Sequence, residues 1–274
     1  MPVTLAPPAP FAARVPEPDE PMTPEENAAY AAWVGSPLGR AIHALIAARA
    51  LRRAALPPGG RVLCVAEGDG TLARALAARR PDVRVLGTDL SPDMIARALA
   101  RPRPPNLEFR PASAYDLSAV APADLVVCAF SFHHLHRPAD GLREMLRAVA
   151  PGGTLYVLDL RRDADAAQLA GHLAEVAPAT RGLTARSVAA AHTIEELRAL
   201  VGAAVGAAVG AAVGAAGCAR FDIGRVRWSA DDEAALLGAA PADLLPPLEH
   251  VRGRIDGLWV EAVIEAVIEA VSKR

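Results

Sequence analysis

Two short segments hold most of the residues that could carry out chemistry. Residues 66–70 read Ala-Glu-Gly-Asp-Gly, with Asp89 further along, and residues 133–136 read His-His-Leu-His. Gly68 and Gly70 let the chain bend sharply and bring bare backbone against an adenosine-bearing ligand. The Asp89 carboxylate can accept hydrogen bonds from the two hydroxyls of a ribose. A histidine can take a proton from a hydroxyl or amine nucleophile, because imidazole titrates near neutral pH.

The elements that must position these residues alternate between strands and helices. An apolar run at 61–65 precedes the glycine turn, a helical stretch follows the turn, and a second apolar run ends at Asp89. This order is the front half of a nucleotide-binding α/β domain. Residues 122–160 then read as strand, aromatic and histidine-rich loop, helix, Pro-Gly-Gly turn and strand. The pattern predicts an α/β fold.

Nicotinamide dinucleotides and S-adenosylmethionine (SAM) both bind to this layout, and the sequence favours SAM. A dinucleotide site favours a third glycine, in the pattern G-x-G-x-x-G. The residue three positions after Gly70 is Ala73. The Tyr-x-x-x-Lys pair of NAD(P)-dependent oxidoreductases is also missing, since the only lysine is Lys273.

Residues 20–227 resemble the class I SAM-dependent methyltransferases, in the small-molecule branch typified by the ubiquinone and menaquinone C-methylases. The resemblance rests on the segments 61–95 and 122–160. It implies a Rossmann-like, seven-stranded, mostly parallel sheet with a helical N-terminal lid at 22–56 and a SAM-binding domain at 57–274. The implied activity is methyl transfer from SAM to an oxygen, nitrogen or carbon atom of a small molecule by in-line displacement.

The resemblance also assigns site residues. It places the methionine end of SAM along 66–70, the ribose on Asp89 and the adenine between Leu90 and Met94, with the loop after the fourth strand on the path to the substrate. The cofactor-binding candidates lie in loops after strands, at the start of the helix that follows Asp89, or in the lid: Ala66, Glu67, Gly68, Gly70, Asp89, Leu90, Met94, Ser113, Ala114, Ala129, Phe130 and Tyr30.

Three positions depart from the family pattern. Family members usually carry Asp and Gly where this chain has Cys64 and Ala66, and an adenine-binding Asp where it has Ser113. The alanine adds a methyl group close to the ligand, the cysteine removes an acceptor behind it, and the serine makes a weaker contact. These changes keep open the alternative of a degenerate, noncatalytic binding module with the methyltransferase fold.

His133, His134 and His136 also raise the question of a metal. No carboxylate or cysteine at a fitting spacing completes a ligand set, and adjacent histidines on a loop rarely both reach one ion. The sequence therefore predicts no metal site. The resemblance instead places His133 and His134 at the mouth of the active site, where either is a candidate general base.

The composition limits partners and compartment. The chain has 274 residues with a formal net charge of −2, which argues against a nucleic-acid surface. Cys64 and Cys128 fall in expected buried strands, so we expect free thiols and a reducing cytoplasm. Seven of the first 21 residues are proline, which predicts a disordered tail over 1–21. A small-molecule acceptor is the expected partner, and a homodimer is compatible with the sequence.

Helix signals are clearest in the lid. The residues Thr-Pro-Glu-Glu from Thr23 provide an N-cap, a proline in the first turn and two acids. A break at 35–37 separates this helix from a second one. The lid would bring Tyr30 over the cofactor.

Two tandem expansions interrupt the second half. The tetrapeptide VGAA is repeated four times over 201–216, and its few strongly apolar residues argue against a membrane span. We interpret it as an expansion within the helix before the sixth strand. The segment 259–271 repeats a similar four-residue pattern, and we expect it to be the last, antiparallel strand, beginning near Leu258. Substrate-shaping insertions are expected at 161–191 and 228–257.

Overall fold

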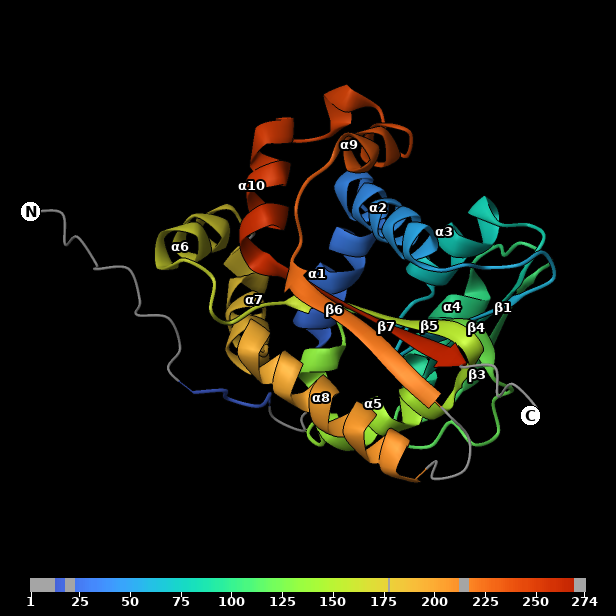
Figure 1. Cartoon of the computed structure of the whole chain (residues 1–274). Helices are drawn as coiled ribbons and strands as arrows, with labels where there is room; N and C mark the ends of the chain where they lie inside the picture. The colour runs from blue at the N-terminus through green and yellow to red at the C-terminus, as the bar shows by residue number, and fades with distance from the viewer. Residues whose placement is uncertain (1–12, 18–22, 177, 212–216, 269–274) are drawn as a thin grey trace, which may run out of the picture.

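A seven-stranded sheet lies at the centre of the protein, as the computed structural model shows (Figure 1). The structure describes residues 13–17, 23–176, 178–211 and 217–268. The strands are β1 Arg61–Val65, β2 Arg84–Asp89, β3 Leu107–Pro111, β4 Ala123–Ala129, β5 Val149–Leu160, β6 Gly217–Arg225 and β7 Trp259–Ile268. Their order is β3-β2-β1-β4-β5-β7-β6. The strands from β3 to β5 pair in parallel, and β7 is antiparallel to β5 and β6.

The sheet is buried on both faces, which explains the continuous apolar runs in the sequence. In β1, Val62 and Cys64 pack into the core on one face, while Leu63 and Val65 pack into the core on the other. The predicted seven-stranded, mostly parallel sheet is therefore confirmed.

Helices cover both faces (Figure 1). On one face lie α2 Pro37–Arg53, α3 Thr71–Arg79, α4 Pro92–Ala100, α9 Ala230–Leu237 and α10 Leu248–Leu258. On the other face lie α5 Pro138–Arg147 and α8 Ile194–Ala211. The remaining helical elements are α1 Pro24–Gly35, α6 Ala166–Glu175, α7 Pro178–Ala190 and the 3-10 turns η1 Phe132–His134 and η2 Ala242–Leu244. The expected insertions are thus largely helical.

The predicted helix signals of the lid are confirmed. Thr23 and Glu26 form a reciprocal capping box at the start of α1, and α1 ends at Gly35. Ser36 then caps α2, which starts with Pro37. These caps satisfy N–H groups that a helix leaves without partners in its first turn.

Strand β5 begins earlier than expected. The predicted turn at 151–153 lies inside β5, where the pairing with β4 shifts register between Ala123 and Leu125. Gly152 has a left-handed φ of 79°, a conformation that glycine adopts without strain. The Pro-Gly-Gly sequence thus makes a bulge in a strand and not a turn before it.

The repeats occupy the elements that the sequence predicted. The VGAA repeat is helical up to Ala211, and 212–216 lie outside the described residues. Within α8, Val201 and Ala204 are buried. The second expansion is strand β7, which begins at Trp259, one residue after the expected start. Within the described parts of the chain, no helix has both the length and the apolar character to cross a membrane.

Part of the predicted disordered tail is instead packed on the protein. The Arg14 side chain donates to the carbonyl oxygens of Ala190 at 2.6 Å and His133 at 2.8 Å. The Val15 amide donates to the Ala189 oxygen at 3.0 Å. These acceptors are backbone atoms that only the folded chain presents, so composition could not reveal them. The prediction was wrong for 13–17, while 1–12 and 18–21 lie outside the described residues.

Candidate active site

The candidate residues gather at the carboxyl ends of the parallel strands. The chain reverses its strand order between β1 and β4, and open α/β sheets bind ligands in the crevice at such a switch point. A hydrogen bond joins the two loops at this switch point, since the Ser131 hydroxyl after β4 donates to the Ala66 carbonyl oxygen after β1 at 2.8 Å. The sequence did not single out Ser131.

Left-handed backbone shapes the loop after β1. Gly68 has φ 65° and Gly70 has φ 80°. A Cβ at Gly70 would overlap the Phe109 ring of β3, and a Cβ at Gly68 would lie 3.1 Å from the Tyr30 hydroxyl. Gly70 is therefore required by space as well as by φ, whereas at Gly68 the left-handed φ is the main reason for glycine.

Ala66 shares this left-handed conformation, with φ 52°. An L-residue there costs roughly 1–2 kcal/mol relative to right-handed backbone. This strain gives a physical reason for glycine at this position in methyltransferases. The departure identified in the sequence is thus accommodated at a cost and does not break the loop.

Asp89 ends β2 and holds the glycine loop. Its Oδ2 accepts from the Gly68 amide at 2.8 Å, and its Oδ1 accepts from the Ser91 amide at 2.8 Å. Each carboxylate oxygen can accept a further hydrogen bond. Asp89 is half-buried, so the same carboxylate can both fix the loop and accept from a ligand.

Glu67 differs from its expected role along the cofactor. Its carboxyl turns inward, where it accepts from the Ala73 amide at 2.6 Å and from the Cys64 thiol. Burial raises its pKa to about 8, against the effect of the Ala73 hydrogen bond, so the group is mostly neutral at pH 7. A carboxyl group therefore lies beside the position where family members carry the strand-one Asp.

The residues expected around the adenine line the next two strand ends. Leu90 is 70% exposed directly after β2, and Met94 is half-buried in the first turn of α4. After β3, the Ser113 hydroxyl accepts from the Tyr115 amide at 3.1 Å, and Ala114 beside it is half-buried. The Ser113 hydroxyl retains its own proton for a ligand acceptor.

Tyr30 reaches the site from α1. Burial raises the pKa of its hydroxyl, and the nearby carboxylates of Asp69, Glu67 and Asp89 act in the same direction. The Tyr30 hydroxyl thus lies beside the glycine loop, within 3.1 Å of where a Cβ at Gly68 would be. Its ring is tilted against Trp33, with centroids 6.4 Å apart.

The loop after β4 carries Ala129 and Phe130, both half-buried. Phe130 adopts a left-handed φ of 51° and packs edge-on against Trp259 of β7, with ring centroids 4.9 Å apart. Trp259 itself is buried. Phe130 is therefore held rigidly beside the switch point.

His133 is buried and oriented by Asp159 at the end of β5. Its Nδ1 lies 2.7 Å from Asp159 Oδ1, and its backbone amide donates to Oδ2 at 2.7 Å. Burial alone would lower the pKa of His133, but the Asp159 charge and hydrogen bond outweigh it and raise the pKa. The other ring nitrogen, Nε2, is buried and has no hydrogen-bond partner among the residues that the structure describes. The apolar run of β5 ends near Asp159, and this position at a strand end is the signal in the sequence that could have pointed to it.

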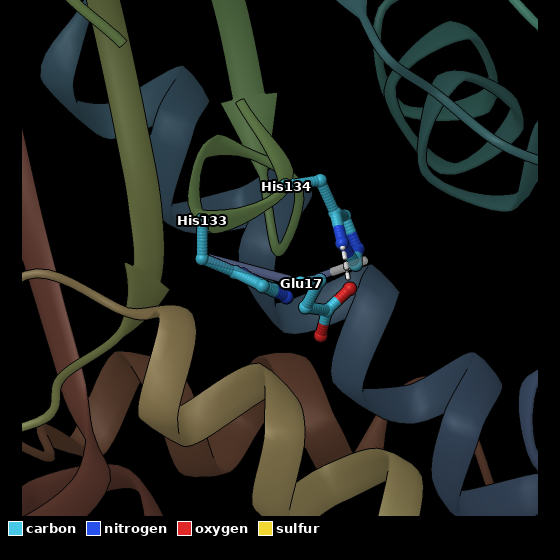
Figure 2. Close-up of side chains that lie close together, drawn as sticks. All are labelled: Glu17, His133 and His134. Carbon is cyan, nitrogen blue, oxygen red and sulfur yellow. Dashed lines mark hydrogen bonds and ion pairs between the residues drawn. The ribbon is translucent and has the colours of Figure 1, made fainter. Parts of the chain in front are cut away.

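His134 faces Glu17 from the N-terminal segment (Figure 2). The His134 Nδ1 lies 2.6 Å from Glu17 Oε2, and the Ser187 hydroxyl donates to Oε1 at 2.7 Å. Although burial acts to raise the pKa of Glu17, these contacts lower it to about 2. The ring centroids of His133 and His134 lie 4.0 Å apart. No sequence signal pointed to Glu17, which lies in a proline-rich stretch 117 residues before His134.

Comparisons with known proteins agree with this geometry. Residues 62–153 match the methyltransferase domain family. The chain is 38% identical over 102 residues to a demethylmenaquinone methyltransferase of Deinococcus radiodurans. The aligned region covers 36% of this chain and 42% of that protein. It is 36% identical over 111 residues to a trans-aconitate 2-methyltransferase of Methylobacterium nodulans, covering 40% of this chain and 42% of that protein. The matches thus span less than half the length of these relatives.

A solved structure extends the likeness over most of the chain. The plantazolicin methyltransferase BpumL, crystallised with a monoazolic desmethyl analogue and SAH, superimposes with a TM-score of 0.62. The superposition covers 89% of this chain and 91% of BpumL at 16% identity. The fold is therefore the Rossmann-like fold of class I methyltransferases.

Proposed function

We propose that the chain transfers a methyl group from SAM to a small molecule. The proposal starts from the match of residues 62–153 to the methyltransferase domain family. The observation that carries the proposal is the joint position of the glycine loop and Asp89 at the switch point, held together by the bond from the Gly68 amide to Asp89. The relatives act on small molecules, as their names state.

The residues present fit SAM. The bare backbone at Gly68 leaves room under the Tyr30 hydroxyl that a side chain would fill. The Asp89 oxygens have capacity for the ribose hydroxyls, and the exposed Leu90 side chain offers an apolar surface for the adenine. When bound, SAM supplies an activated methyl group on its sulfonium.

The chain's own residues then have three tasks. The loop after β1 and the β2 carboxylate bind and orient the cofactor, and the lid helix α1 excludes water through Tyr30. Phe130 limits the approach to the methyl group. His133 accepts a proton at Nε2 from a hydroxyl or amine nucleophile, since Asp159 holds Nδ1 and leaves Nε2 as the open ring nitrogen. His134 lies beside it at the mouth.

The test is methyl transfer to small-molecule acceptors from methyl-labelled SAM, with a metabolite extract as the source. We expect label in at least one product. His133→Gln should lower turnover by about 10²-fold or more while SAM affinity holds. SAM binding without any transfer would instead favour a noncatalytic module, and unchanged turnover of the variant would remove His133 from catalysis.

The setting of the proposed reaction is the cytoplasm. Cys64 and Cys128 are buried free thiols, which suit a reducing compartment. A homodimer is compatible with this function, and light scattering measures it directly.

A further inference from the structure

We propose that Glu17, His133 and His134 form a three-ligand site for a divalent transition-metal ion, with zinc as the best match. In the sequence, no carboxylate or cysteine stands at a fitting spacing from the histidines. The fold supplies the missing carboxylate from the N-terminal segment, so the objection from spacing no longer applies.

The three side chains converge on one point (Figure 2). One ligand atom from each residue can be chosen such that all three lie within 4.8 Å of one another. Tetrahedral zinc with bonds of about 2.0–2.1 Å to histidine nitrogen needs ligand atoms a little over 3 Å apart. The ligand atoms must therefore draw closer when an ion binds, and the exposed His134 side chain has room to move.

The buried ring nitrogen of His133 is the second, independent observation. His133 is 2% exposed, and within the described parts of the chain its Nε2 has no hydrogen-bond partner. Leaving a buried polar atom unsatisfied costs about 1–3 kcal/mol, which a metal–nitrogen bond would offset. The Nδ1 on the other side of the ring contacts Asp159 at 2.7 Å. A carboxylate that orients a metal-binding histidine in this way is a recurrent feature of zinc sites.

The charged side chains around the cluster of Glu17, His133 and His134 favour the binding of a cation. The Glu17 and Asp159 carboxylates face two imidazoles, and the nearby cation Arg14 is directed to the backbone oxygens of His133 and Leu135. With neutral imidazoles, these three charged side chains leave a net charge of −1. Two nitrogens and one oxygen suit zinc and similar ions better than magnesium or calcium, which prefer oxygen ligands.

The site is open on one side. The His134 side chain is 49% exposed and that of Glu17 is 14% exposed, so solvent reaches the cluster. Three protein ligands leave a fourth position for water or another ligand. A bound ion would occupy the Nε2 lone pair that accepts the proton in the function proposed above, so His133 cannot fill both roles at once. The metal proposal concerns binding alone and does not depend on methyl transfer.

The experiment uses the full chain without an affinity tag, after treatment with a chelator and in the absence of SAM. Zn²⁺ is titrated by calorimetry, and Co²⁺ is followed by its visible absorption, which reports coordination. We expect one ion per chain. Glu17→Gln and His134→Gln should each weaken binding at least 10-fold, whereas His250→Gln, which changes an exposed histidine on α10, should not.

Circular dichroism and thermal unfolding check that each variant is folded. Absence of saturable binding to the wild-type chain would overturn the proposal, and so would equal affinity in wild type, Glu17→Gln and His134→Gln. Methyl transfer is measured in a separate assay with labelled SAM. A negative result in that assay therefore leaves the metal proposal untouched, and a negative metal titration leaves the methyl-transfer proposal untouched.

Discussion

Replacing Asp89 by alanine tests how one carboxylate serves both the fold and the cofactor. In the structure its two oxygens accept from the amides of Gly68 and Ser91, each at 2.8 Å. Alanine removes both acceptors and leaves the amides facing a half-exposed site.

The magnitudes follow from the strength of hydrogen bonds to charged groups, about 1.5–3 kcal/mol each. Water can resolvate the freed amides, so we expect Asp89→Ala to lower the free energy of unfolding by about 3 kcal/mol, the lower end of the range for two such bonds. Loss of two bonds to the ribose should weaken SAM binding by about 3 kcal/mol, or roughly 10²-fold. Asp89→Asn keeps one oxygen acceptor and should fall between wild type and alanine.

Urea unfolding measures the first effect, and calorimetry well below the melting temperature of the variant measures the second. Asp93→Ala is the matched control, because Asp93 is an exposed carboxylate in the first turn of α4. It should cost less than about 1 kcal/mol and leave SAM affinity unchanged. If Asp89→Ala matched wild type in both stability and affinity, the assigned role of this carboxylate would be refuted.

Three further changes probe the site and its scaffold. The raised pKa of Glu67 means that the folded chain keeps a proton that the unfolded chain releases, so stability should fall by up to about 1.4 kcal/mol per pH unit between pH 5 and 8. Urea unfolding across this range should show a flatter profile for Glu67→Gln, and an unchanged profile would contradict the assignment. Gly70→Ala should lower stability by about 1–3 kcal/mol more than Gly59→Ala in thermal unfolding, because both have left-handed φ but only Gly70 faces a side chain that an added Cβ would overlap; equal losses would argue against that overlap. Deleting 203–214 should preserve the fold and SAM affinity, since the junction restores alanine at the buried position 204; loss of folded protein in expression trials would indicate that the long helix packs on a partner.

Local patterns predicted the elements that position the site. The run before the glycines, the turn and the acid that ends β2 are adjacent in sequence, so their types and spacing were sufficient. The capping box at Thr23 is also local. The four-residue period of 259–271 suited a helix as well as a strand, and the place of the last strand in the fold favoured the strand.

Contacts between distant segments were not predictable in the same way. Glu17 meets His134 only because residues 13–17 bind backbone oxygens of η1 and α7, and such acceptors have no residue-type pattern. The direction of the Glu67 side chain depends on the buried space beside Cys64 and on the free amide of Ala73 in α3. The loop was therefore predicted, but the role of its glutamate was not.

Titration of SAM into the wild-type chain by calorimetry tests the central claim most directly. We predict saturable binding with one SAM per chain, and competition by S-adenosylhomocysteine for the same site. The glycine loop, Asp89 and Tyr30 would then hold the cofactor as proposed. A folded chain that gives no heat of binding with SAM would contradict the account and leave the methyltransferase fold without its cofactor.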